Sequence, residues 1–411
     1  MTVQPPDRLQ RLVAGVARSA TSFGTDPDRP LHQGRYQSPL RDERLAAWLG
    51  AALGVLFTIC FVTGLFSHAH QHPLRWFPVP ARPAGLYRFT QGLHVAAGIA
   101  SVPVLIAKLW LVWPRLLSVP PVRRPSDVVE RVGLLALVGG GIFMVWTGVA
   151  NIAQWYPWRF SFTAAHYQVA WITIGGIVAH VGAKWVVARR ALRRPSRRPA
   201  LADADPVLGT TTEEPHTGLT RRGFLATVAG AGGVLTAVTV GQTVRPLAPL
   251  GLLAPRDPRQ QPVNRSAANA GVVEAATSPA YRLEITGRVR QPLSLTLDEV
   301  RALPPTEAEL PISCVEGWSY SARWKGVALS ELLRRAGAPS GAAVEVESLE
   351  ANSPYRVSHL NRRQAADRHT LLATHLDGEA LSPDHGYPVR LIGPGRPGVN
   401  QTKWVTRVVV L

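Results

Sequence analysis

The sequence is poor in cysteine: its 411 residues include two, Cys60 and Cys314. Cys60 lies inside an apolar run and Cys314 lies in the second half, so a disulfide framework is not expected. The two are too far apart in the chain for a CxxC redox pair, and a cysteine-only zinc site needs more of them. Cys314 therefore stands alone as the thiol of the second half.

Acidic residues are scarce in the first part of the chain. Residues 1–263 carry 28 Lys/Arg against 12 Asp/Glu, whereas residues 264–411 carry 17 against 15. A basic chain can bind nucleic acid, but here the basic residues lie between long apolar runs. That distribution is typical of a membrane protein with arginine-rich cytoplasmic loops. It predicts a lipid bilayer as a partner and no nucleic acid.

Five apolar runs approach the ~20 residues that a helix needs to span a bilayer. They cover residues 45–66, 90–113, 132–150, 164–187 and 224–244. The first four predict an all-α antiparallel transmembrane bundle over residues 45–190. The fifth predicts a further membrane helix, over residues 220–245.

Arginine placement predicts the orientation, because Lys and Arg concentrate in cytoplasmic loops. The clusters are Arg35, Arg41 and Arg44; Arg115, Arg123 and Arg124; and the arginines from Arg189 to Arg222. They put the amino-terminal segment, 1–44, and a linker, 191–219, in the cytoplasm. The chain is then a multi-pass protein of the cell membrane, with its carboxy-terminal domain on the extracytoplasmic side.

Histidines recur within the membrane runs. His94 and His166 lie near the outer ends of the second and fourth runs, and each has a basic residue 14 positions later, Lys108 and His180. Two histidines at matching depth on parallel helices can hold a haem iron axially. The layout resembles cytochrome b-like four-helix domains, which implies a haem b at His94 and His166. Alternatively, these histidines bond backbone or head groups, and Lys108 argues against an inner haem.

A cluster of three histidines, "HAHQH" (His68, His70 and His72), follows the first run. We expect solvated histidines in an outer loop, with a loop metal site as the alternative.

The sequence pattern of residues 264–411 predicts an α+β domain. A Pro-rich connector, residues 246–263, precedes it. "YRLEITGRV" and "AAVEVESLE" alternate like strands, and "LTLDEVRAL" has helical spacing behind a threonine cap. "VALSELLRRAG" predicts a short amphipathic helix. The last stretch predicts two strands joined by a Gly/Pro loop.

Two motifs carry a resemblance that covers this domain. "SCVEGWS" and "DHGYPVRLIGPGRPGVNQTKWV" resemble the molybdopterin-dependent oxidoreductases of the sulfite oxidase family. In motif they are closest to the periplasmic methionine-sulfoxide reductase catalytic subunit. The resemblance implies a sulfite-oxidase fold, a molybdenum–molybdopterin cofactor, and Cys314 as catalytic residue and molybdenum ligand, since a thiolate is a soft metal ligand. It implies further cofactor contacts at Asn264, Ser348, His385, Arg390, Gln401, Thr402 and Lys403.

Two departures bear on the substrate. The sequence ends seven residues after Trp404, so we expect no carboxy-terminal dimerisation domain. Glu316 and Trp318 replace the basic surroundings of sulfite-specific members. We expect two-electron, oxygen-atom chemistry on a small, sulfur-containing substrate, with electrons from the quinone pool or another carrier. The alternatives are a non-catalytic membrane-anchored binding protein, a haem-free anchor for an independent molybdoenzyme, and a thiol enzyme.

The fifth run begins with "LTRRGFLATVAGAGGVL". Its arginines, Arg221 and Arg222, resemble a twin-arginine export signal, which implies the export machinery as a partner. That route carries folded proteins, as a domain loaded with cofactor in the cytoplasm requires. No A-x-A cleavage site follows closely, so we expect the helix to remain as an anchor.

Overall fold

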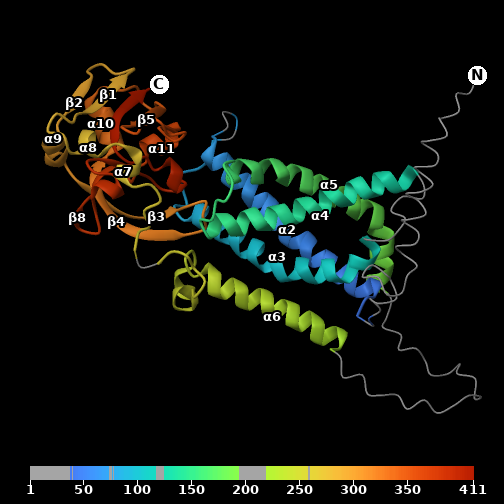
Figure 1. Ribbon diagram of the computed structural model, residues 1–411. Helices are drawn as coiled ribbons and strands as arrows, with labels where there is room; N and C mark the ends of the chain where they lie inside the picture. The colour runs from blue at the N-terminus through green and yellow to red at the C-terminus, as the bar shows by residue number, and fades with distance from the viewer. Residues whose placement is uncertain are drawn as a thin grey trace, which may run out of the picture. The chain divides into compact units, whose positions relative to one another are not determined.

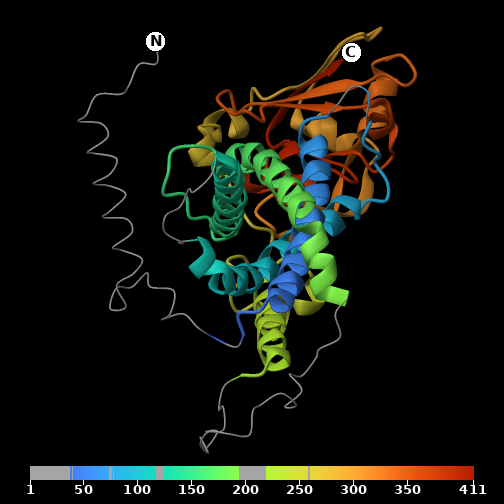
Figure 2. The same ribbon diagram turned by 90° about the vertical axis from the view of Figure 1, so that its right-hand side faces the viewer.

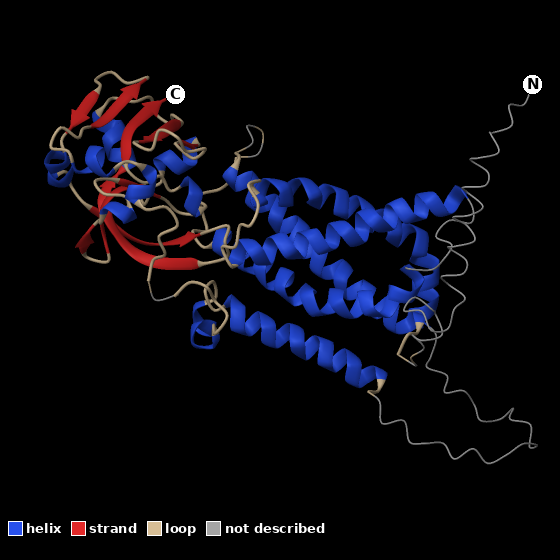
Figure 3. Cartoon of the chain, viewed as in Figure 1, coloured by secondary structure: helices blue, strands red, loops and turns tan. Residues whose placement is uncertain are grey.

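The computed structural model describes residues 38, 40–73, 76, 78–116, 125–193, 219–257 and 260–411. Most of the expected amino-terminal segment and linker lies outside these residues, as do Arg35, Arg123 and Arg124. Helices make up the first part of the chain, and all strands belong to the second (Figures 1 and 3).

Five helices are long and apolar enough to cross a membrane, as the five runs predicted. They are α2 (Glu43–Gln71), α3 (Leu86–Leu116), α4 (Pro125–Ile152), α5 (Phe162–Arg193) and α6 (Arg221–Val240). Helix α6 ends four residues before the predicted limit of 244. The chain turns there at Gly241, where a Cβ would lie 2.7 Å from the carbonyl oxygen of Leu247. A 3-10 helix, η2 (Arg245–Leu250), follows.

The histidine cluster does not lie in a loop, so that prediction was wrong. His68 and His70 belong to α2, and His72 directly follows it. Polar residues extend the helix beyond the apolar run, and His70 Nδ1 bonds the carbonyl of Phe66 one turn earlier, at 2.9 Å. Within the described ranges, no three His, Cys, Asp or Glu side chains gather as a metal site.

The chain divides into two compact units. The first consists of the described parts of 1–58, 97–150 and 156–235, and the second of those of 59–96, 151–155 and 236–411. In the first unit, α2, α3 and α6 share a core of Leu45, Leu49, Leu53, Val104, Ala107, Leu111 and Val228. Large apolar side chains such as Leu135 and Val178 are about 70% exposed on the helices, a surface suited to lipid.

The second unit holds two sheets, whose strands are orange and red in Figure 2. One sheet has the order β2-β1-β10-β5-β6, in which β1 and β10 are parallel; the other has the order β3-β4-β7-β8, with β9 on β7. Their bounds are β1 (Leu283–Gly287), β2 (Leu293–Leu295), β3 (Thr306–Ser313), β4 (Ser319–Ala328), β5 (Val344–Ser348), β6 (Val357–Leu360), β7 (Leu371–Leu376), β8 (Glu379–Ala380), β9 (Arg390–Ile392) and β10 (Val405–Val410).

Short helices link the strands. They are α7 (Ala267–Ala270), α8 (Val273–Thr277), α9 (Leu297–Ala302), α10 (Leu329–Arg335), α11 (Arg362–Ala366), η3 (Pro383–His385) and η4 (Gly398–Asn400). The predicted threonine cap is confirmed, because Thr296 and Glu299 form a reciprocal capping box on α9. The two closing strands are β9 and β10.

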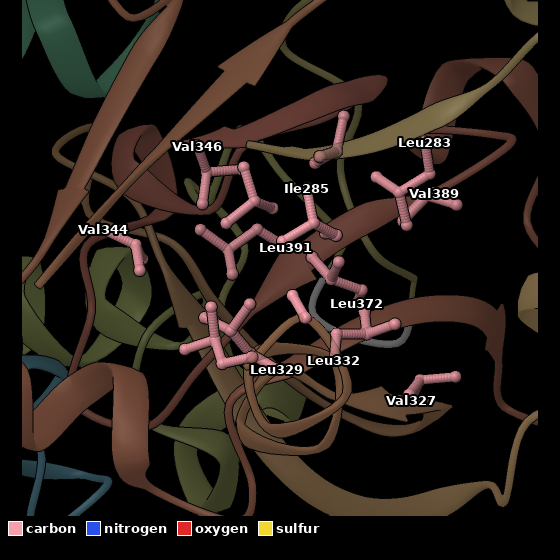
Figure 4. Close-up of a cluster of buried hydrophobic side chains, with 14 of the residues drawn as sticks. Leu283, Ile285, Val327, Leu329, Leu332, Val344, Val346, Leu372, Val389 and Leu391 are labelled. Atoms are coloured by element: carbon pink, nitrogen blue, oxygen red, sulfur yellow. The ribbon is translucent and has the colours of Figure 1, made fainter. Parts of the chain in front are cut away.

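The main core of the second unit is built from residues of both sheets and of α10. Ile285, Leu332 and Val346 are fully buried and point toward one another (Figure 4). Alternate residues of β1 and β5 face this core, as expected for strands with one buried face. The core fixes the strand ends from which the site residues project.

Candidate functional site

Cys314 lies in the turn of a β-hairpin. Strands β3 and β4 are antiparallel, with Ser313 opposite Ser319, so residues 314–318 form the connection. The Cys314 amide donates to the Trp318 carbonyl at 2.9 Å, which closes the turn. Gly317 adopts φ +88°, a conformation that favours glycine. The sequence "SCVEGWS" thus holds the cysteine at the end of a buried strand.

The Cys314 thiol is buried and has one side-chain donor. Asn264 Nδ2 lies 3.2 Å from its Sγ. Burial, and then the charge of Glu316, raise the pKa of Cys314 to about 12. Such a thiol is inert as a nucleophile at neutral pH, which argues against the thiol-enzyme alternative. A bound metal cation would deprotonate it.

Glu316 is the carboxylate beside Cys314, and two of its partners were not foreseen from the sequence. Its Oε2 accepts from Gln154 Nε2 at 2.5 Å and from Trp318 Nε1 at 3.2 Å. Arg256 Nη2 lies 3.8 Å from the same oxygen. Burial raises the pKa of Glu316. Gln154 and Arg256 come from segments that carry no local signal for such a role.

Helix ends assigned to the second unit also hold the turn. The Val315 carbonyl accepts from Asn151 Nδ2 at 3.0 Å and from Gln91 Nε2 at 3.4 Å. The Ser319 amide donates to the Gln242 carbonyl at 2.9 Å. The turn is therefore fixed by side-chain and backbone groups that lie far from it in the sequence.

A second cluster of site residues contains two cations, a buried arginine and a half-buried lysine. Arg390 is 3% exposed, its Nη1 donates to the His385 carbonyl at 3.0 Å, and its Nε bonds no described residue. Burial lowers the pKa of Arg390 to about 9. The Lys403 ammonium donates to the carbonyls of Arg265 and Asp384, each at 2.7 Å. Burial, and then Arg390, lower the pKa of Lys403 to about 7.

Arg390 and Lys403 lie together. A Cβ at Gly386 would be 3.2 Å from the Cβ atoms of both. Neither forms an ion pair with a carboxylate of the described residues. A buried guanidinium and a half-buried ammonium, both held mainly by carbonyl groups, suit an anion with several acceptor oxygens, such as a phosphate.

Comparison with known proteins matches this part of the chain. The family model described as oxidoreductase molybdopterin binding domain covers residues 270–411. Residues 270–411 form a molybdopterin-binding oxidoreductase domain. It belongs to the sulfite oxidase and nitrate reductase family.

The relatives share this domain. Nitrate reductase [NADH] 1 of Arabidopsis thaliana is 34% identical in an alignment of 173 residues that covers 34% of this chain and 19% of the plant protein. Nitrate reductase [NADH] 1 of Oryza sativa subsp. japonica gives the same figures. The chain thus spans about one fifth of these relatives. The sulfane dehydrogenase SoxCD from Paracoccus pantotrophus is 30% identical, with a TM-score of 0.30, over 32% of this chain and 38% of that one.

The residues of the domain fit molybdopterin. Cys314 offers a single thiolate, and among the described residues there is no group of ligands that would hold a metal alone. A pterin dithiolene would supply the remaining metal ligands. The buried Nε of Arg390 and the Lys403 ammonium would provide donors for its phosphate.

The remaining residues predicted to contact the cofactor surround Lys403, but their side chains bond the protein itself. Ser348 donates to the Lys403 carbonyl at 2.8 Å, and Thr402 donates to Ser358 at 2.6 Å. The Gln401 amide bridges the Gly393 N–H and the carbonyls of Pro311 and Arg396, and His385 bonds Ser382 and the Gln261 carbonyl. Cofactor contacts here would use backbone groups. Asn264 lies at Cys314, in the other cluster.

His94 and His166 fall in different units, but each has the same local setting. His94 Nδ1 lies 2.9 Å from the Cys60 carbonyl and 3.1 Å from Thr63 Oγ1. His166 Nδ1 lies 2.8 Å from Thr147 Oγ1, whose own proton goes to the Phe143 carbonyl. We assign the ring proton of both histidines to Nδ1, because each Nδ1 faces an oxygen that can accept it; in this tautomer the lone pair is on Nε2.

The threonines share a sequence signal, because each is followed by a glycine. Thr63-Gly64 lies in α2 and Thr147-Gly148 in α4. A Cβ at Gly64 would lie 3.1 Å from His94 Cε1, and one at Gly148 would lie 3.8 Å from His166 Cε1. A Thr-Gly pair thus faces each histidine.

Proposed function

We propose that this chain is a membrane-anchored molybdenum oxidoreductase that exchanges two electrons and an oxygen atom with a small substrate, with sulfur compounds as the first candidates. The observation that carries the proposal is the buried Cys314 thiol in the same matched domain as two cations, the buried Arg390 and the half-buried Lys403. A non-catalytic binding protein has no need of this pairing of a soft metal ligand with a phosphate-binding cluster.

When bound, the cofactor supplies a metal that changes its oxidation state by two electrons and accepts or donates oxygen. Cys314 would hold the metal, and the Asn264 amide would stabilise its sulfur as thiolate by donating a hydrogen bond. Arg390 and Lys403 would hold the phosphate. Burial of the turn, in which Cys314 is 5% exposed, keeps water from the sulfur.

For the electron supply we propose a haem b held by His94 and His166, fed by the quinone pool or another carrier. The support is their shared tautomer. A metal-binding histidine normally donates its other ring N–H to a protein oxygen, which orients the ring. Thr63 and Thr147 provide that oxygen in α2 and α4.

For the localisation we propose that the molybdopterin-binding domain lies outside the cytoplasm, exported folded by the twin-arginine route, with α6 kept as anchor. The support is Arg221 and Arg222 at the start of α6 and the arginine bias of the predicted loops. Replacing both with lysine should prevent the loaded domain from reaching the outside. A loaded external domain in that variant would contradict this part.

The test of the proposed function uses the full-length protein purified in detergent. Its visible spectrum should show haem b. Sulfoxide reduction should be assayed with quinol or a reduced viologen dye as electron donor, and sulfite oxidation beside it with quinone or ferricyanide as electron acceptor. Full quinol-driven activity without haem absorbance would refute the electron-transfer part. A loaded protein inactive on all oxides and oxyanions with the dye would refute the catalytic part.

A further inference from the structure

Arg256 lies in the segment from which the sequence predicts only a connector. Its Nη2 donates to Asn264 Oδ1 at 3.0 Å. The Nδ2 of the same amide lies 3.2 Å from Cys314 Sγ. A single side chain therefore separates this guanidinium from the sulfur that would bind molybdenum.

One donor of Arg256 is unused. Its Nε is buried and bonds no described residue, although an N–H buried without an acceptor is costly. A guanidinium presents its donors in a planar fork that suits oxygen acceptors. The guanidinium therefore lies two hydrogen bonds away from the Cys314 sulfur and keeps a buried donor that no described residue uses.

The charge of Arg256 is compensated. Glu316 Oε2 lies 3.8 Å from Nη2, and this oxygen is held by Gln154 and Trp318. The carboxylate therefore stays in place beside the guanidinium, and the pair has no net charge. An oxyanion that approaches Arg256 meets the repulsion of Glu316 at short range, whereas an uncharged oxide does not.

We propose that Arg256 binds the oxygen atom of the substrate, and that the Arg256–Glu316 pair selects uncharged sulfur or nitrogen oxides over oxyanions. The inference rests on the proposed molybdenum oxidoreductase function and assigns its substrate class. Arg256 is then a specificity-determining residue supplied from outside the matched domain.

The test measures kcat and KM of the full-length, molybdenum-loaded enzyme with reduced viologen, so that the haem proposal does not enter. The probes are dimethyl sulfoxide, trimethylamine N-oxide and nitrate. The wild type should favour the two oxides. Arg256→Met should raise their KM about 10- to 100-fold, the effect of losing a hydrogen bond from a charged donor, with a smaller change in kcat. Arg256→Lys should recover part of the loss.

Two further variants sharpen the result. Arg334→Met, at a guanidinium 71% exposed on α10, is the matched control and should behave as the wild type. Glu316→Gln should lower the KM for nitrate relative to that for dimethyl sulfoxide. The Mo(V) electron paramagnetic resonance signal gives a readout besides turnover: dimethyl sulfoxide should perturb it in the wild type and not in Arg256→Met.

Unchanged KM values and an unchanged signal response in Arg256→Met would overturn the role of Arg256 and leave the proposed function intact. A wild type that favours nitrate, or a Glu316→Gln enzyme with unchanged preference, would overturn the substrate class. A loaded wild type that turns over no oxide or oxyanion would refute the proposed function itself.

Discussion

Arg390→Met should stabilise the cofactor-free protein and weaken the cofactor-bound protein. Burial lowers the pKa of Arg390 from 12.5 to about 9, and each unit corresponds to about 1.4 kcal/mol. Keeping the charge inside the empty domain therefore costs about 5 kcal/mol. The hydrogen bond to the His385 carbonyl and the cation–π contact with the Trp324 ring, 5.4 Å away, offset about 2–3 kcal/mol of this cost. Methionine would occupy the space of the aliphatic part of the arginine side chain. We therefore expect Arg390→Met to increase the free energy of unfolding of the cofactor-free domain by about 2 kcal/mol.

The assay is differential scanning calorimetry of the full-length protein in detergent, made in hosts with and without molybdopterin synthesis. Without the cofactor, a gain of this size should raise the Tm of the molybdopterin-binding domain by about 4–8 °C. With the cofactor the sign should reverse, because a phosphate loses its partner, and molybdenum retention on dialysis should fall about tenfold.

Arg396→Met is the matched control. Arg396 is equally buried, but its guanidinium donates hydrogen bonds to the carbonyls of Asn400 and His359 and to the amide oxygen of Gln364. Its loss should destabilise both forms, because these oxygens lose their donors. If Arg390→Met lowers the Tm of the cofactor-free protein, or leaves molybdenum retention unchanged, the phosphate assignment is wrong.

Three other predictions concern different parts of the chain. Burial lowers the pKa of Lys403 from 10.5 in the unfolded chain to about 7 in the folded protein. Between these pH values the folded state binds fewer protons than the unfolded state, so the free energy of unfolding of the cofactor-free protein should increase from pH 7 to pH 10. Denaturant titrations measure this increase, and a flat profile would refute it. Gly326→Ala should destabilise the domain by about 1–3 kcal/mol in the same titrations, because its Cβ would overlap the Leu372 carbonyl; wild-type stability would contradict the β4–β7 register. Thr63→Val and Thr147→Val should each weaken haem binding about 10- to 100-fold. Unchanged haem absorbance and reduction potential in both variants would mean that the shared histidine tautomer no longer supports the haem proposal.

The sequence predicted the parts of the fold that depend on local or one-dimensional constraints. Bilayer thickness sets the length of an apolar run, so all five long helices were predicted. The capping box at Thr296 and the position of Cys314 after a strand follow from short motifs. The end of α6 and the helical state of His68 and His70 were missed, because they depend on a turn at Gly241 and on polar residues that continue a helix.

The contacts around Glu316 could not be predicted for a different reason. Gln154 and Arg256 reach Glu316 across long stretches of sequence, and neither belongs to a periodic pattern or a motif. The Thr-Gly pairs were detectable in principle, since they recur in α2 and α4, but their meaning depends on which histidine each pair faces.

The central claim is that Cys314 binds molybdenum in a molybdopterin-dependent enzyme. Its most direct test is the molybdenum content of full-length wild type and Cys314→Ser, purified side by side from a host that makes the cofactor. We expect near-stoichiometric molybdenum in the wild type, with the metal lost or its Mo(V) signal altered in Cys314→Ser. A wild type without molybdenum, or a serine variant with the same content and the same signal, would contradict it.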